Sequence, residues 1–179
     1  MRLGLTILAL WASPSLADEV TVCYNYSCAV QAKVVFPEQR MHQLESHFQH
    51  LATPSAERTA IAWVIGRLEA LAGEQSPTYR DRGGNLNDDG LDGRMDCIDH
   101  SHNTTAYLRL MESRGWLKFH RVLEPVKRAP FMVIEHWSAH IMEIDTQQEF
   151  AVDSWFFDNG QPAAIYNLED WMRGASPDV

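Results

Sequence analysis

Three side chains in the second half of the sequence, Cys97, His140 and Asp153, have the types and the order that nucleophilic catalysis by a thiol requires. In such a triad a thiolate attacks a carbonyl carbon, an imidazole moves the proton, and a carboxylate orients the imidazole. An unpaired cysteine in an exported protein is a bridge to another chain, an inert buried residue or a reactive nucleophile. The neighbours of Cys97 must distinguish these three interpretations.

The other two of the three cysteines, Cys23 and Cys28, lie in β-rich runs around an expected turn at Asn25 and Tyr26. This spacing lets the two thiols face each other across a hairpin, which predicts a small-loop disulfide. A redox-active or metal-binding pair is the alternative, but no second pair of cysteines or histidines flanks them at zinc spacing. The disulfide would leave Cys97 as the odd thiol.

Cys97 stands at the start of an expected helix that runs to Glu112 and is closed by Gly115. A helix N-terminus carries roughly half a positive charge and favours a thiolate over a thiol. The backbone N–H of Cys97 is the expected first donor to an oxyanion, as in acyl-transfer sites generally. No upstream side chain can be assigned as the second donor.

The relative position of His140 and Asp153 follows from the register of an expected hairpin with strands over 140–144 and 149–155. If two or four residues of the turn-like segment 145–148 close this hairpin, His140 lies directly opposite Asp153. Opposed side chains are about 4.5–5.5 Å apart at Cβ, within reach of a carboxylate–imidazole hydrogen bond. His136 would lie about 13 Å along the strand. A three-residue loop would shift this register by one.

The remaining pattern predicts a single α+β domain. A polar helix is expected within 37–51, and apolar residues at three- and four-residue spacing predict an amphipathic helix from Ser55 to about residue 72. A long polar loop follows over 73–95. Further strands are expected at 116–122 and 131–134, and a short helix at 168–173.

The N-terminus predicts a signal peptide over residues 1–17, with Arg2 as the positive region, an apolar stretch from Leu3 to Trp11, and a cleavage site at Ser15-Leu16-Ala17. The mature domain would span 18–179, with a β-hairpin at 18–36, and would be periplasmic or secreted. An uncleaved N-terminal anchor is the alternative. No later run is apolar enough to cross a membrane.

Composition excludes some partners. Hydrophobic residues make up 45% and charged residues 22% of the 179-residue chain, which is typical of a globular protein. The formal net charge of −9 argues against nucleic acid and against adhesion to anionic lipid.

Four segments between residues 94 and 158 are similar, in order and spacing, to the transglutaminase-like cysteine peptidase superfamily, and most closely to the bacterial transglutaminase-like cysteine proteinases. These segments are Asp96-Cys97-Ile-Asp99, Arg109-Leu-Met-Glu-Ser-Arg-Gly115, Ala139-His140-Ile-Met-Glu143 and Val152-Asp153-Ser-Trp155. The resemblance implies a papain-like α+β fold, with Cys97 as nucleophile, His140 as base and acid, and Asp153 as the orienting group. The helix after Cys97 is more polar than is usual in that family.

The spacing of oxygen and nitrogen ligands suggests two metal sites. Residues 85–96 follow the calcium-loop pattern, with oxygen ligands at Asn85, Asn87 and Asp89, Gly90 at the sixth place and Asp96 at the twelfth. A solvated loop is the alternative. His136 and His140, together with His100 and His102, suggest a zinc site, but residues four apart on a strand cannot share one metal.

We therefore expect an exported cysteine hydrolase that cleaves a peptide or amide bond through a thioester at Cys97 and requires no cofactor. The expected partner is a peptide or protein substrate, which includes cell-envelope proteins. Acyl transfer from a protein glutamine to an amine, and a non-catalytic cell-envelope binding module on the same fold, are the alternatives.

Overall fold

The computed structural model describes residues 17–129 and 135–177. In these ranges the elements follow in the order β1 (Asp18–Tyr24), β2 (Val30–Phe36), α1 (Glu38–Glu45), the 3-10 helix η1 (Ser46–Phe48), α2 (Pro54–Gly73), the 3-10 helix η2 (Pro77–Arg80), α3 (Cys97–Ser113), β3 (His120–Arg128), β4 (His136–Glu143), β5 (Glu149–Asp153), β6 (Ala164–Asn167) and α4 (Leu168–Met172). The predicted signal peptide lies almost entirely outside the described residues, as does the strand expected at 131–134.

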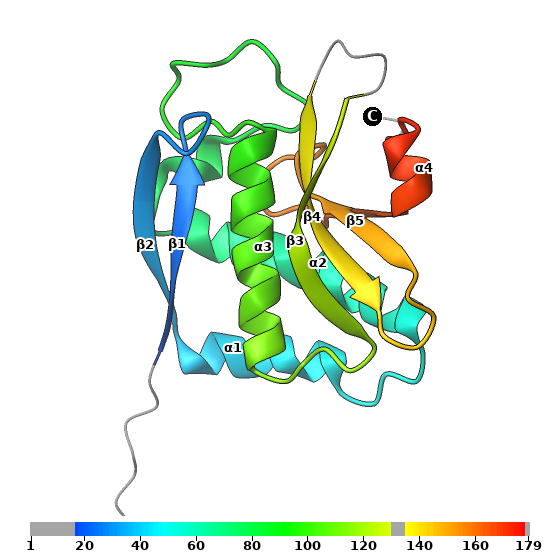
Figure 1. Cartoon of the computed structure of the whole chain (residues 1–179). Helices are drawn as coiled ribbons and strands as arrows, with labels where there is room; N and C mark the ends of the chain where they lie inside the picture. The colour runs from blue at the N-terminus through cyan, green and yellow to red at the C-terminus, as the bar shows by residue number, and fades with distance from the viewer. Residues whose placement is uncertain (1–16, 130–134, 178–179) are drawn as a thin grey trace, which may run out of the picture.

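Helix α3 lies between two antiparallel sheets (Figure 1). On one side is the two-stranded hairpin of β1 and β2, and on the other is a sheet in the order β3-β4-β5-β6. Helix α2 runs behind α3, and α4 lies at the far side of the larger sheet (Figure 1). The predicted α+β class with an antiparallel sheet is confirmed.

The two long helices begin where their capping residues dictate. Thr53 accepts a hydrogen bond from the N–H of Ala56, and Pro54 occupies the first turn of α2, so this helix starts one residue before the predicted Ser55. Asp96 caps α3 by accepting from the N–H groups of Ile98 and Asp99, and the Asp99 side chain accepts from the N–H of Asp96. This reciprocal capping box fixes Cys97 as the first residue of α3, as predicted.

Buried apolar side chains of α2 and α3 meet those of both sheets in one core. Tyr107, Leu108 and Met111 of α3 are almost fully buried, as are Val22 and Phe36 of the hairpin. Burial of each such side chain stabilises the fold by roughly 1.5–3 kcal/mol. The core therefore fixes the position of the nucleophile helix between the hairpin and the larger sheet.

Strand β3 begins at His120, not at Trp116 as predicted. The N–H groups of Lys118, Phe119 and His120 donate to the buried carboxylate of Glu57 in α2 instead of to a neighbouring strand. Strand β6 was not predicted. Its segment, Ala164–Asn167, is only four residues long, too short for its apolar residues to give a strand signal.

The predicted register of the β4–β5 hairpin is wrong. Met142 pairs with Glu149 and His140 pairs with Ala151, and Gln147 adopts the left-handed conformation at φ 60° in the turn. The turn therefore closes earlier than the segment 145–148 suggested. A shift of two residues keeps each side chain on its face of the sheet but moves His140 away from Asp153.

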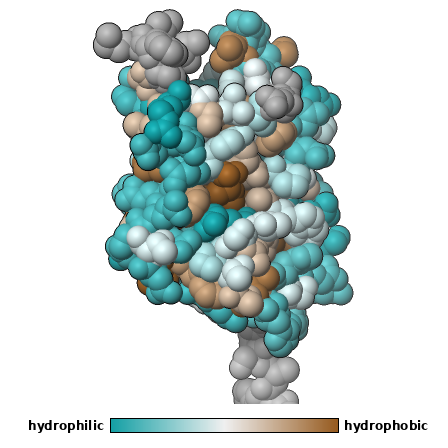
Figure 2. Space-filling view, turned by 90° about the vertical axis from the view of Figure 1, so that its right-hand side faces the viewer, coloured by the Kyte–Doolittle hydropathy of each residue, from teal (hydrophilic) through white to brown (hydrophobic). Residues whose placement is uncertain are grey.

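Among the described residues, none of the helices combines the length and apolar content that crossing a lipid bilayer requires. The side of the molecule on which α4 lies is mostly hydrophilic, with apolar surface gathered near its middle (Figure 2).

Candidate active site

Cys97, His136 and Asp153 come together at one end of the larger sheet. Cys97 is the first residue of α3, His136 the first of β4, and Asp153 the last of β5. Cys97 and His136 line the same cavity, and the Cys97 Sγ lies 4.0 Å from the carbonyl oxygen of Glu135, next to His136 in the chain. The arrangement pairs the predicted cysteine and aspartate with a histidine that was not predicted.

Asp153 holds the imidazole of His136 in one orientation. The His136 Nε2 lies 2.6 Å from Asp153 Oδ2, and only 1% of the Asp153 residue surface is exposed. The same Oδ2 accepts from the indole Nε1 of Trp171 at 2.9 Å, and Oδ1 accepts from the N–H of Trp155 at 3.3 Å. These donors satisfy the buried carboxylate and fix its plane.

His136 contacts a buried carboxylate and lines the cavity that the Cys97 sulfur also lines. Burial lowers the pKa of His136, but the influence of Asp153 and of Cys97 outweighs this effect and raises the pKa to about 9. Because Nε2 is used by Asp153, Nδ1 is the ring nitrogen left for Cys97. The rings of Trp155 and Trp171 lie 4.9 and 5.7 Å from the imidazole and limit its contact with water.

His140 occupies a different environment from the one predicted. Its Nδ1 lies 3.3 Å from the carbonyl oxygen of Glu124, and its Nε2 lies 3.2 Å from a carboxylate oxygen of Glu149. In the observed register the residue of β4 on the Asp153 row is Ser138, midway between the two histidines. The hydrogen bond to Asp153 is made by His136.

The cavity beside Cys97 has a volume of about 270 Å³. It is lined by residues of the hairpin tip, the 81–96 loop, β3 and β4, and the segment after β5; these residues are Tyr26, Asn85, Leu86, Asp96, Cys97, Arg128, Glu135, His136 and Trp155. Cys97 is partly exposed, so its sulfur can be reached from the cavity. Its N–H is in the first turn of α3, where no intrahelical acceptor exists.

A buried polar network supports the site from behind and explains the polar first turns of α3. His100 lies with Nε2 3.0 Å from Asp81 and Nδ1 2.8 Å from the hydroxyl of Ser154, which follows Asp153. Asp81 also accepts from the N–H of Met95, just before the capping residue of α3. Burial lowers the pKa of His100, but Asp81 and Glu69 raise it to about 10. The buried imidazolium of His100 thus links the segment that precedes Cys97 to the segment that follows Asp153.

The acidic loop that resembles a calcium site uses carboxylates in ion pairs. Asp88 lies 3.0 Å from Arg94 and accepts from the hydroxyl of Tyr26, while Asp92 lies 2.8 Å from Arg80. In the described part of the chain, the one group of at least three potential metal ligands is Cys23, Cys28 and Asp99. Calcium binding at 85–96 stays a prediction; of its expected ligands, Asp96 already accepts from the N–H groups of Ile98 and Asp99 as the cap of α3.

In the part of the chain that the structure describes, the four histidines of the suggested zinc site do not come together. His100 is buried against Asp81 and Glu69, whereas His136 and His140 make separate contacts with Asp153 and Glu149.

Comparison with known proteins gives no relative: no family model, no curated protein and no solved structure matches the chain.

Two residues of the site were missed in the sequence. The turn-like residues at 145–148 indicated a register that favoured His140, whereas the observed loop over 144–147 places Asp153 level with Ser138 and favours neither His136 nor His140. Trp171 carried no signal, because its role depends on the return of the chain through β6 and α4 to the end of β5.

Proposed function

We propose that the protein is an exported cysteine hydrolase that cleaves a peptide or amide bond, with Cys97 as nucleophile, His136 as base and acid, and Asp153 as the orienting group. The observation that carries the proposal is the 2.6 Å contact of the His136 imidazole with the buried carboxylate of Asp153, at a cavity that His136 lines together with the partly exposed Cys97. His136 replaces the expected His140 in this proposal.

In the first half of the reaction the Cys97 sulfur, its proton held by His136, adds to the carbonyl carbon of the substrate. The N–H of Cys97 is placed to donate to the oxygen that becomes negative. The C–N bond then breaks, and the amine leaves with the proton that His136 Nδ1 supplies. In the second half His136 takes a proton from water as the hydroxide attacks the thioester carbon. The C–S bond then breaks, the carboxylic acid product leaves, and His136 returns the proton to the Cys97 sulfur.

The wider identification rests on the same geometry. A nucleophile helix whose first residue meets a histidine and an aspartate from an antiparallel sheet is the core that the transglutaminase-like peptidases would be expected to have. The Cys23–Cys28 disulfide supports export, because disulfides persist in oxidising compartments. We therefore propose a papain-like core in a periplasmic or secreted protein.

The chain offers a matched pair of variants to test the assignment. His136→Ala should lower hydrolysis of a casein or mixed-peptide substrate by at least about a hundredfold, since general acid–base catalysis contributes roughly that much. His140→Ala removes an equally buried histidine four residues along the same strand and should leave the rate within about twofold. Cys97→Ala should abolish both hydrolysis and iodoacetamide labelling.

Three results of these assays would contradict the proposal. Equal loss in the two histidine variants, or greater loss in His140→Ala, would refute the assignment of His136. Iodoacetamide labelling that is equally fast in the wild type and in His136→Ala would show an unactivated thiol, as in a binding module. Faster substrate consumption on adding a primary amine, with the amine incorporated into product, would indicate acyl transfer in place of hydrolysis.

A further inference from the structure

The tip of the β1–β2 hairpin has an unusual backbone. Cys23 is in β1, Cys28 lies in the turn before β2, and their disulfide closes the segment between them. Asn25, Tyr26, Ser27 and Cys28 all have φ between 54° and 66°. This conformation is sterically unfavourable for a residue other than glycine. Contacts from elsewhere must therefore stabilise the tip.

The predicted disulfide is present, but not as a cross-strand pair. Cys23 pairs with Gln31 in the ladder, so Cys28 belongs to the turn. The left-handed turn directs its N–H groups away from the hairpin, because successive residues of the same left-handed conformation point their N–H groups to one side.

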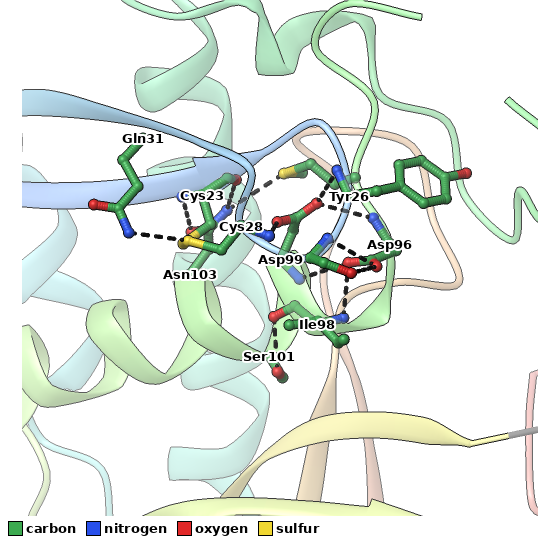
Figure 3. Close-up of a disulfide and its surroundings, with 11 residues drawn as sticks. Cys23, Tyr26, Cys28, Gln31, Asp96, Ile98, Asp99, Ser101 and Asn103 are labelled. Carbon is green, nitrogen blue, oxygen red and sulfur yellow. Dashed lines mark hydrogen bonds between the residues drawn. A yellow bond between two sulfur atoms is a disulfide. The ribbon is translucent and has the colours of Figure 1, made fainter. Parts of the chain in front are cut away.

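Those N–H groups donate to the two carboxylates that flank Cys97 in sequence (Figure 3). The Asp99 oxygens accept from Tyr26 N at 2.8 Å and Cys28 N at 2.7 Å, and an oxygen of Asp96 accepts from Ser27 N at 3.0 Å. Asn103, one turn further along α3, holds both the N–H and the carbonyl of Cys23, at 2.7 and 2.8 Å. The tip is thus attached to the first turns of α3 through main-chain groups.

Asp99 belongs both to the capping box of α3 and to the contact between α3 and the hairpin tip. It is fully buried, and besides the two N–H groups of the tip it accepts from the N–H of Asp96, 3.2 Å away, as the second half of the capping box of α3. A carboxylate that holds the cap and the tip together transmits a displacement of one to the other. Tyr26 of the same tip also forms a wall of the cavity beside Cys97.

We propose that Asp99 is a positioning residue for the thiol chemistry of Cys97, which it couples to the disulfide-closed hairpin tip. This inference rests on the proposed function for its consequence in hydrolysis, but the coupling itself is measured on the thiol. Neither Asp99 nor the disulfide touches the reacting atoms. Their role is to fix the first turn of α3, and with it the sulfur and the N–H of Cys97, against His136.

The coupling between the hairpin tip and the first turn of α3 should depend on pH. Burial and the nearby Asp96 raise the pKa of Asp99 to about 6, although the three N–H donors oppose this rise. Asp96 is the charged group that acts on Asp99; the tip contributes N–H groups and disulfide sulfurs, which do not titrate in this range. Protonation below about pH 6 adds a hydrogen to a carboxyl surrounded by donors, and so removes an acceptor that the cap and tip share.

The test is a double-mutant cycle with iodoacetamide as the probe. Asp99→Asn keeps the shape of the side chain but replaces one acceptor oxygen with a donor, and Cys23→Ser with Cys28→Ser opens the tip. Each should slow alkylation of Cys97 at pH 7.5, by about tenfold if the loss is on the order of what a helix cap contributes to stability. Together they should slow it little more than either alone, because both break one coupled contact. Asp145→Asn, at the exposed far turn, is the matched control and should not change the rate.

Multiplicative effects, about a hundredfold in the combined variant, or no effect of either change, would overturn the proposal.

A second measurement uses the wild type. Its alkylation rate should fall in a step as the pH is lowered through about 6. That step should be lost in Asp99→Asn, and its persistence there would also overturn the proposal. Failure of the proposed function gives a different pattern, in which the wild type and His136→Ala are alkylated equally fast while the cycle still reports on the coupling.

Discussion

The indole Nε1 of Trp171 donates to the same oxygen of Asp153 that lies 2.6 Å from His136, and it does so from 2.9 Å away. Trp171 is fully buried and belongs to α4, the last helix of the described chain. The carbonyl groups of Trp171 and Ala175 in turn accept from the guanidinium of Arg128, at the end of β3. The C-terminal segment is therefore part of the support of the proposed active site.

Trp171→Phe tests that support. Phenylalanine retains an aromatic ring but removes a donor to a buried carboxylate, a bond worth roughly 1.5–3 kcal/mol. We expect kcat to fall by about tenfold or more, since Asp153 would no longer hold His136 in one orientation. Hydrolysis assays on the variant give this value directly. Trp63→Phe, on partly exposed Trp63 of α2, is the control and should be nearly neutral; similar kcat losses in both variants would argue for a general packing effect.

The rate of hydrolysis should fall above about pH 9. The pKa of His136 is raised to about 9, so the ring is protonated below that pH and can supply the proton that the leaving amine needs. Above it the protonated fraction falls tenfold per pH unit. A profile of kcat/KM between pH 7 and 10.5 measures this limb. A rate that keeps rising to pH 10.5 would contradict the role of His136 as the acid.

Stability should decline over a similar range. The folded-state pKa values of His136 and His100, about 9 and about 10, lie above the ordinary value of 6.5, so the protonated forms stabilise the fold. That stabilisation is fully present below about pH 6.5 and is lost as pH rises through 9 and 10. Chemical denaturation at pH 6.5, 8 and 9.5 should show the free energy of unfolding decreasing. In Asp81→Asn, which removes a carboxylate beside His100, the decrease should be smaller; a free energy that is constant or increases with pH in the wild type would contradict the prediction.

Two glycines of the loop that leads to Cys97 provide a matched pair. Gly90 and Gly93 both have φ of 86°, but a Cβ on Gly93 would lie 2.1 Å from the carbonyl oxygen of Pro77, whereas Gly90 has no atom within 4 Å. Gly90→Ala should therefore lose only about 1 kcal/mol of unfolding free energy, the cost of the left-handed backbone. Gly93→Ala adds a collision with backbone and should lose several times more. Thermal denaturation compares the two, and equal losses would show that this loop can move away from Pro77.

Much of the local structure could be predicted from the sequence. The apolar spacing of α2, the start of α3 at Cys97 and the disulfide of Cys23 with Cys28 depend on residues close together in the chain, and each is confirmed. The α+β class followed from the order of these local signals. The catalytic roles of Cys97 and Asp153 stay predictions, now supported by their positions.

The sequence by itself determined that a thiol at a helix N-terminus is followed by two histidines and an aspartate on neighbouring strands. It could not determine which histidine meets Asp153, because the observed register puts Asp153 level with Ser138, equally far along the strand from His136 and His140. Only the tertiary structure decided this, by packing the first turn of α3 against the beginning of β4 and α4 against the end of β5. Strand periodicity determines which face a side chain occupies, whereas its partners at the end of a sheet depend on elements distant in the chain.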